Sequence, residues 1–182
     1  MKKSDIDTVL FEEIIDASDV MLSKYPELKG TGKKPFTIKL EAMNSVDFAE
    51  VRKESPHVLR LNADAVRSRT ALATEYNKLV EIGKFVWGTD YHAVVYHEMG
   101  HMISDVYGID GAAVMMEVLG KSRTETLLWC REHLSDYSFE ANGDEIISEA
   151  FAACYGSDSP RKEIVDFVSK CDKIISERRR SK

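Results

Sequence analysis

The sequence predicts an α+β fold that is rich in helices and has a small sheet on its N-terminal side. Apolar residues recur at helical intervals through most of the 182 residues, whereas alternation of apolar and polar residues is confined to short segments near the N-terminus. The hydrophobic fraction of 43% and the charged fraction of 31% are ordinary for a globular protein. We therefore expect one domain, over residues 1–182, with a hydrophobic core.

The first expected element is an amphipathic helix over residues 4–24. Ser4 and Asp7 form a pair at its start that resembles a capping box. One stripe of the helix is apolar and carries Ile6, Val9, Leu10, Ile14, Ala17 and Met21. The Gly, Pro and Lys residues of segment 29–35 then indicate a loop that separates this helix from the sheet.

Two strands are expected next. In segment 36–42, apolar residues alternate with polar ones, which is typical of a strand with one buried face. A second short strand is predicted at 57–61, and Asn62 can then cap a helix that runs to about residue 82. The inner face of that helix carries Leu72, Tyr76, Leu79 and Val80.

The most informative segment is His97-Glu98-Met99-Gly100-His101. On a helix, two histidines four residues apart lie on one face, so both imidazoles can reach a single metal ion. Glu98 then lies beside the same site, where it can take a proton from a metal-bound water. This spacing is the arrangement of zinc metallopeptidases, and it predicts a Zn²⁺ site.

The residues around this motif favour a helix over about 90–107. Thr89 or Asp90 can cap its start, and Gly108 is expected to end it. The faces away from the histidines are apolar and carry Val94, Val95, Met99, Met102, Ile103 and Val106. We therefore expect a helix with a buried back and a metal-binding face that opens into a cleft.

Four further helices are expected after the motif, near 111–120, 123–134, 143–155 and 159–179. In the last of them, Ser159 is the expected cap, with Pro160 in the first turn. Its inward face is predicted to carry Ile164, Phe167, Val168, Cys171, Ile174 and Ile175. The chain is thus dominated by helices, in line with the predicted fold class.

A catalytic zinc usually needs a third protein ligand. Metzincins place a histidine six residues after the second motif histidine, but this chain has Tyr107 there, so that subclass is excluded. The remaining candidates are downstream carboxylates, of which Glu145 and Glu149 stand four apart on a predicted helix. Spacing alone leaves open which of the two would bind the metal.

The motif, together with Ser135-Asp136-Tyr137 and the later Glu145-Ile146-Ile147-Ser148-Glu149-Ala150-Phe151-Ala152 segment, resembles the gluzincin branch of zinc metallopeptidases. Within that branch, the chain is most similar to the anthrax lethal factor catalytic domain and to zincin-like domains of phage and prophage proteins. The similarity is closest over 89–156 and extends more loosely back to residue 36. It implies a zincin-like domain whose small sheet borders the active-site cleft.

Carried over to this chain, the resemblance implies that His97, His101 and Glu145 bind zinc. It implies that Glu98 is the general base, that Glu149 accepts a hydrogen bond from a ligand histidine, and that Tyr137 donates to the oxyanion. From the residues alone, Tyr137 can equally be a packing residue with a hydrated hydroxyl. The domain would then consist of an N-terminal helical extension, a catalytic core and a C-terminal helix, at 1–28, 36–156 and 159–179.

The expected activity is hydrolysis of peptide bonds by a metal-activated water, with a peptide or protein as substrate. An alternative is a zinc-stabilised structural or interaction module, associated with phage particles, with little or no peptidase activity. The strand at 57–61 can be an ordinary sheet strand and can also be an edge strand that binds substrate by β-augmentation, since the two are not exclusive. The remaining histidines, His57, His92 and His133, are expected to be surface or partly buried residues.

Charge and cysteine content restrict the partners and the compartment. The formal net charge of -6 argues against a protein that binds duplex nucleic acid. The three cysteines are widely spaced and odd in number, which predicts reduced and mostly buried thiols. We find neither a signal peptide nor an apolar run that could span a membrane, so a soluble, cytoplasmic protein without a membrane partner is expected.

Overall fold

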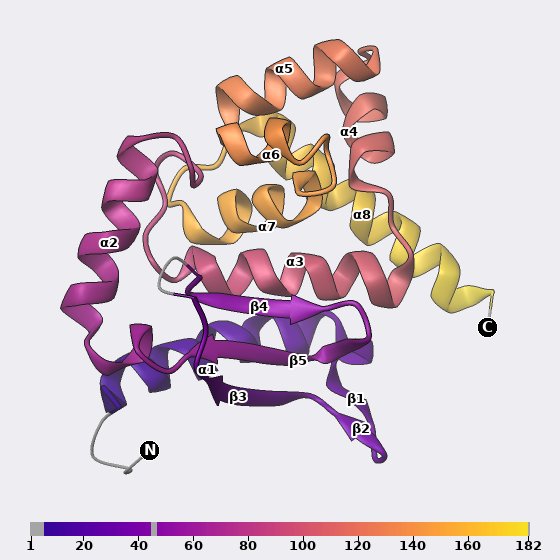
Figure 1. The fold of residues 1–182 in the computed structure, drawn as a ribbon. Helices are drawn as coiled ribbons and strands as arrows, with labels where there is room; N and C mark the ends of the chain where they lie inside the picture. Colours follow the sequence, from indigo (N-terminus) through magenta and orange to yellow (C-terminus); the bar gives the residue numbers. More distant parts are fainter. Residues whose placement is uncertain (1–5, 45–46, 182) are drawn as a thin grey trace.

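The structure is a computed structural model that describes residues 6–44 and 47–181, and it confirms the helix-rich α+β fold (Figure 1). The α-helices are α1 (Thr8–Lys24), α2 (Arg69–Glu81), α3 (Ala93–Tyr107), α4 (Gly111–Leu119), α5 (Arg123–His133), α6 (Asp136–Glu140), α7 (Ile146–Gly156) and α8 (Lys162–Arg180). The strands are β1 (Gly30–Thr31), β2 (Lys34–Pro35), β3 (Thr37–Glu41), β4 (Ala49–Arg52) and β5 (Ser55–Asn62). Two 3₁₀ turns, η2 (Pro26–Lys29) and η3 (Ala65–Arg67), complete these elements.

The main sheet has the strand order β3-β5-β4, with β5 parallel to β3 and antiparallel to β4. The interpretation of the strand at 57–61 as an edge strand is therefore wrong, because β5 is bonded on both sides. The edge strand that contacts α3 is β4, a strand that the sequence did not predict. Its four residues, Ala49–Arg52, alternate apolar and polar, but this is the shortest run in which alternation indicates a strand.

The segment between α1 and the main sheet is more ordered than the expected loop. It contains the turn η2 and the antiparallel pair of β1 with β2. At the start of α1, the side chain of Asp7 accepts the N–H of Leu10 at 3.2 Å and is the N-cap. Ser4, the other half of the predicted capping pair, lies outside the described residues.

Asn62 does not cap a helix, contrary to prediction. It ends β5, and its side-chain amide donates to the carbonyl oxygens of Asn44 and Asp47 at 2.9 and 2.7 Å. The turn η3 follows, and α2 begins only after Ser68, whose hydroxyl accepts the N–H of Ala71. The Asn62 side chain therefore holds the segment that connects β3 to β4. The sequence position of Asn62 gives no indication of this contact.

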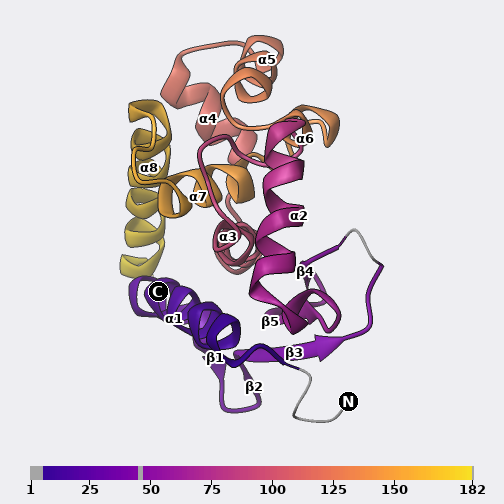
Figure 2. The same cartoon turned by 90° about the vertical axis from the view of Figure 1, so that its left-hand side faces the viewer.

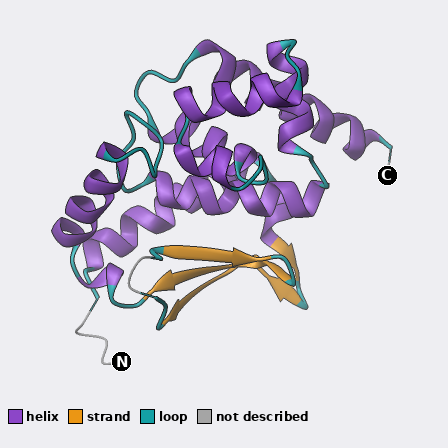
Figure 3. Cartoon of the chain, turned by 45° about the horizontal axis from the view of Figure 1, so that its top comes forward, coloured by secondary structure: helices purple, strands orange, loops and turns teal. Residues whose placement is uncertain are grey.

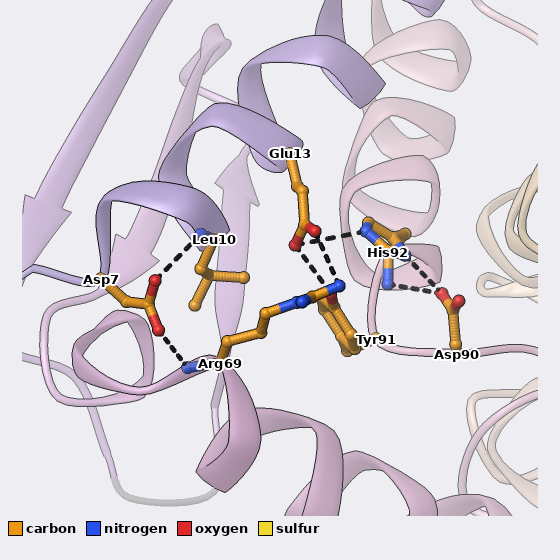
Figure 4. A network of polar contacts seen from close by, with 7 residues as sticks. All are labelled: Asp7, Leu10, Glu13, Arg69, Asp90, Tyr91 and His92. Carbon is orange, nitrogen blue, oxygen red and sulfur yellow. Dashed lines mark hydrogen bonds and ion pairs between the residues drawn. The ribbon is translucent and has the colours of Figure 1, made fainter.

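A polar network joins α1, α2 and the start of α3 (Figure 4). The Arg69 guanidinium lies 2.8 Å from a Glu13 oxygen and donates to the hydroxyl of Tyr91, which in turn donates to Glu13. Asp90 accepts the N–H of His92 at 2.9 Å. The N-cap of α3 is His92, so neither Thr89 nor Asp90 occupies that position, although Asp90 stabilises the first turn.

The C-terminal helices differ from prediction at their starts. Helix α7 begins at Ile146 with Glu145 as its N-cap, and α8 begins at Lys162 with Arg161 as its N-cap. Ser159 is therefore not the cap of α8; its N–H donates to the hydroxyl of Ser157 in the preceding turn. Helix α6 was not expected, because five residues are too short for a periodic pattern.

Helix α3 lies at the centre of the molecule. Figure 2 shows it nearly end-on, between α7 on one side and α1 with the sheet on the other, and Figure 3 shows the helices gathered over one face of the sheet. Val95, Met99, Met102 and Ile103 of its apolar back are buried as expected, whereas Val94 and Val106 are only partly buried and Val94 lines the cleft. Helix α1 contributes to the same buried cluster. The motif helix is thus held on all sides except that of the predicted metal face.

The three cysteines are free thiols, and two of them are buried, as expected. Cys130 and Cys171 are buried and unpaired, and burial raises the pKa of each thiol to about 12. Cys154 is also unpaired and partly exposed.

Within 6–44 and 47–181, we find no helical stretch with the length and hydropathy that crossing a bilayer requires.

Candidate metal centre

Two glycines allow α3 and α7 to pack in direct backbone contact. A Cβ atom at Gly100 would lie 2.6 Å from the Cα of Ser148, closer than real Cβ contacts come. At the other end of the contact, a Cβ atom at Gly156 would lie 2.7 Å from that of Ala93. Because larger residues at these positions would separate the helices, the glycines set the distance between the motif helix and the carboxylates of α7.

This packing brings His97, His101 and Glu145 together. One potential ligand atom from each residue lies within 4.8 Å of the others. Oε2 of Glu145 is 3.2 Å from Nε2 of His97 and 3.1 Å from Nε2 of His101. Two imidazole nitrogens and a carboxylate oxygen therefore converge on one small volume.

The cluster fits a metal ion better than it fits a hydrogen-bonded core. Oε2 of Glu145 is buried and finds no hydrogen-bond partner among the described residues, despite its nearness to both imidazoles. A buried carboxylate oxygen without a partner is costly, and a cation between the three atoms would remove that cost. Two histidines and a glutamate are also the donor set of three-ligand catalytic zinc sites.

Charge interactions in the cluster also favour a bound cation. Burial opposes ionisation of Glu145, but the two imidazoles hold its pKa well below the usual range. Burial likewise disfavours a charged His97, yet the carboxylates of Glu145 and Glu149 raise its pKa well above the ordinary value. The pocket therefore favours positive charge beside an ionised Glu145, which a divalent cation would supply.

Glu149 contacts the opposite side of the His97 ring. Its Oε1 lies 2.9 Å from Nδ1 of His97, and the side chain is only 1% exposed. A carboxylate in this position holds the imidazole so that Nε2 faces the cluster. The structure thus brings Glu149 to the place that the resemblance implied for it, and Glu145 to the place implied for a ligand.

Glu98 lies next to the cluster and borders the same cleft. Its side chain is 7% exposed, and burial raises the pKa of its carboxyl, which the imidazoles of His97 and His101 only partly oppose. A raised pKa brings a carboxylate closer to the range in which it can accept and return a proton near neutral pH. The geometry is compatible with the predicted general base.

The cluster opens into a cleft of ≈ 620 Å³ between α3, α2 and the edge strand β4. Tyr137 stands at the rim of this cleft on α6, 39% exposed, with its ring centroid 6.5 Å from that of His97. The opposite wall is formed by Phe48, Ala49, Glu50, Val51, Tyr76, Leu79, Ile82 and Phe85, and the sequence interpretation missed the part contributed by residues 48–51. Tyr76 and Leu79 of this wall do belong to the inner face that the sequence predicted for the helix before the motif.

The other histidines lie away from the cluster. Nδ1 of His57 is 3.1 Å from the carbonyl oxygen of Leu28, and Nδ1 of His92 is 2.8 Å from a carboxylate oxygen of Asp90. His133 packs edge-on against Trp129. All three are surface or partly buried residues, as expected.

Comparisons with models of protein families, with curated proteins and with solved structures find no match to this chain.

Proposed function

We propose that this protein is a zinc-dependent peptidase of the gluzincin type with a zincin-like domain. The observation that carries the proposal is the convergence of two imidazole nitrogens, at 3.2 and 3.1 Å, on one buried oxygen of Glu145, beside a buried Glu98. The cleft next to these groups is large enough for several residues of an extended peptide. A peptide or protein chain is accordingly the proposed substrate.

His97, His101 and Glu145 would hold the zinc. Bound zinc supplies a water of lowered pKa and polarisation of the scissile carbonyl. Glu98 would accept the proton of the attacking water and deliver it to the departing amine nitrogen. Glu149 would keep the His97 ring in its ligating orientation through the Nδ1–H group, and Tyr137 would donate its hydroxyl proton to the developing oxyanion.

A second function is compatible with the same ligands. The three candidate ligands come from α3 and from the start of α7, two helices that are in backbone contact at Gly100. A metal held there would stabilise this helix pair even without turnover. A structural zinc module is therefore the alternative, and the two functions differ in what they require of Glu98.

The test uses the full chain and its Glu98→Gln variant. We expect purified wild type to carry one zinc per chain, measured by elemental analysis, and to cleave sites in a proteome-derived peptide mixture identified by mass spectrometry. Glu98→Gln should keep the zinc and the melting temperature and lose nearly all cleavage, because the amide cannot accept the proton. Equal cleavage by both proteins would contradict the peptidase mechanism. Zinc binding without any cleavage by wild type would favour the structural module.

A further inference from the structure

A row of aromatic rings lies on the cleft wall opposite α3. It consists of Phe48, directly before β4, of Phe85, between α2 and α3, and of Tyr76 on α2, and all three residues line the cleft. The ring centroids of Tyr76 and Phe85 are 4.8 Å apart, with an interplanar angle of 21°. Those of Phe85 and Phe48 are 6.0 Å apart, with an angle of 48°. Both separations are typical of favourable aromatic pairs, so the three rings form a continuous row.

Exposure increases along this row. Tyr76 is 2% exposed and its hydroxyl is hydrogen-bonded to that of Thr89 at 2.7 Å, so this ring anchors the inner end. Phe85 and Phe48 pack against the hydrophobic core but are only partly buried. Because both line the cleft of ≈ 620 Å³, a side chain that enters the cleft can reach them while the core stays closed. The outer end of the row is thus accessible to a ligand.

Aliphatic side chains continue the same wall. Leu79 and Ile82, at the C-terminal end of α2, line the cleft, and Ile82 is 64% exposed. Apolar surface that remains in contact with water inside a cleft is typical of a binding surface. We therefore expect an apolar group to bind against this wall, and the neighbouring rings to determine which kind of apolar group binds best.

We propose that Phe48 and Phe85 form a subsite that selects an aromatic side chain in the peptide substrate. Burial of apolar area alone does not favour an aromatic ring over a saturated ring of the same size. Aromatic pairs add an electrostatic attraction between ring faces and ring edges, which a saturated ring lacks. A ligand ring would extend the existing row by one member. Selection of a substrate residue rests on the proposed peptidase function, whereas binding of the ring itself does not.

Ring binding can be measured with two neutral probes, N-acetylphenylalanine amide and N-acetylcyclohexylalanine amide, on the full chain as purified. The probes differ only in whether the ring is aromatic or saturated. In an NMR titration, we expect the aromatic probe to bind about 2- to 10-fold more tightly, which is the contribution of one aromatic pair. The methyl signals of Leu79 and Ile82 should shift as it binds. Equal affinities, tighter binding of the saturated probe or no binding of either would overturn the proposal.

Variants of the wall test the assignment to these two rings. Phe85→Leu removes a ring and keeps most of the apolar volume, so it should bring the two affinities close together at a small loss of stability. Phe48→Leu should have the same effect, and it keeps the test valid if Phe85→Leu does not fold. The matched control is Ile82→Ala, which removes apolar area from the same wall without removing a ring. It should weaken both probes about equally and keep the preference.

Two results with these variants would contradict the assignment. If both leucine variants keep the preference for the aromatic probe, the rings of Phe48 and Phe85 do not cause it. If Ile82→Ala removes the preference as fully as the leucine variants do, the wall selects by apolar area and not by aromatic pairing.

A cleavage experiment then tests the substrate. Matched peptides that carry either phenylalanine or cyclohexylalanine beside the cleaved bond should differ in kcat/KM by a similar factor. A preference in probe binding without cleavage of any peptide would refute the peptidase function and leave the aromatic subsite in place. Equal kcat/KM for the two peptides would refute the selection of an aromatic substrate residue.

Discussion

The two walls of the cleft are built in different ways. The helical wall, from α3 and α7, is buried and held at a fixed spacing by Gly100 and Gly156. The opposite wall, from β4, α2 and the segment before α3, consists largely of half-buried residues, and Ile82 at its rim is 64% exposed. The proposed metal ligands and Glu98 stand on the first wall, whereas the residues of the second wall mainly provide surface for what enters the cleft.

This difference matters because a metal centre and a binding surface have different requirements. Metal ligands must stay within a few tenths of an ångström of their positions, which rigid helices in backbone contact provide. A surface that accepts a flexible chain can adjust its side chains. We therefore expect substitutions on the helical wall to change metal affinity and stability, and substitutions on the other wall to change turnover or selectivity alone.

The largest expected effect separates the two carboxylates of the helical wall. Glu145→Ala removes a proposed ligand and should nearly abolish zinc binding, measured by competition with a chromogenic chelator. Glu149→Ala removes only the partner of His97 and should weaken binding by about 10- to 100-fold. Asp144→Ala, which removes an exposed neighbouring carboxylate, is the control and should bind zinc like wild type. A larger loss for Glu149→Ala would exchange the two assignments.

The helical wall was largely predictable from sequence, and the opposite wall was not. The spacing of His97 and His101 fixes their common face once a helix is assumed, and the cap Gly108 adopts the expected left-handed conformation with φ 64°. Strand β4 alternates apolar and polar over only four residues, which is a weak signal. The role of Gly100 depends on which helix packs against it, which is long-range information that no local pattern in the sequence contains.

The next prediction asks whether the opposite wall contributes to chemistry at all. Tyr137 belongs structurally to that side, because the N–H of Asp136 donates to the carbonyl of Gly83 at 2.8 Å and Lys84 pairs with Glu140 at 2.6 Å. Tyr137→Phe should keep zinc and the fold, and should lower kcat about 10- to 1,000-fold on a cleaved peptide if the hydroxyl stabilises the oxyanion. An unchanged kcat would make Tyr137 a packing residue.

A smaller effect is expected from widening the helix contact. Gly100→Ala places a methyl group against the backbone of Ser148, and we expect a loss of about 1–3 kcal/mol in unfolding free energy, offset in part by the better helix propensity of alanine. Zinc affinity should fall as well, because the added methyl group would push α7, and with it the proposed ligand Glu145, away from α3.

Gly32→Ala is the control for this variant, since no described atom lies within 4 Å of the added methyl group. Its melting temperature and zinc affinity should match those of wild type. If Gly100→Ala is as stable as Gly32→Ala and binds zinc equally well, the two walls do not differ in rigidity as we infer.

The smallest expected effect comes from an ion pair that lies outside both walls, where the C-terminal end of α3 meets η2 and α8. The Arg179 guanidinium donates to both carboxylate oxygens of Glu27, and the Tyr107 hydroxyl donates to Oε2 of Glu27. Arg179, with a smaller contribution from Tyr107, lowers the pKa of Glu27 to about 2 from an ordinary value of 4.5. The group is more than a third exposed, so its contribution to stability is small.

Because the folded pKa lies below the unfolded one, this contribution is fully present above about pH 4.5 and is lost as the pH falls toward 2. Arg179→Gln should therefore lower the melting temperature by a degree or two at pH 6, roughly the size of an exposed pair, and the difference from wild type should vanish near pH 2. Lys162→Gln removes an exposed pair with Asp166 on the same helix and should change the melting temperature less. If Arg179→Gln instead weakens zinc binding strongly, then surface contacts at the end of α3 are needed to hold the helical wall in place. The contacts at Gly100 and Gly156 would then not be sufficient to do so.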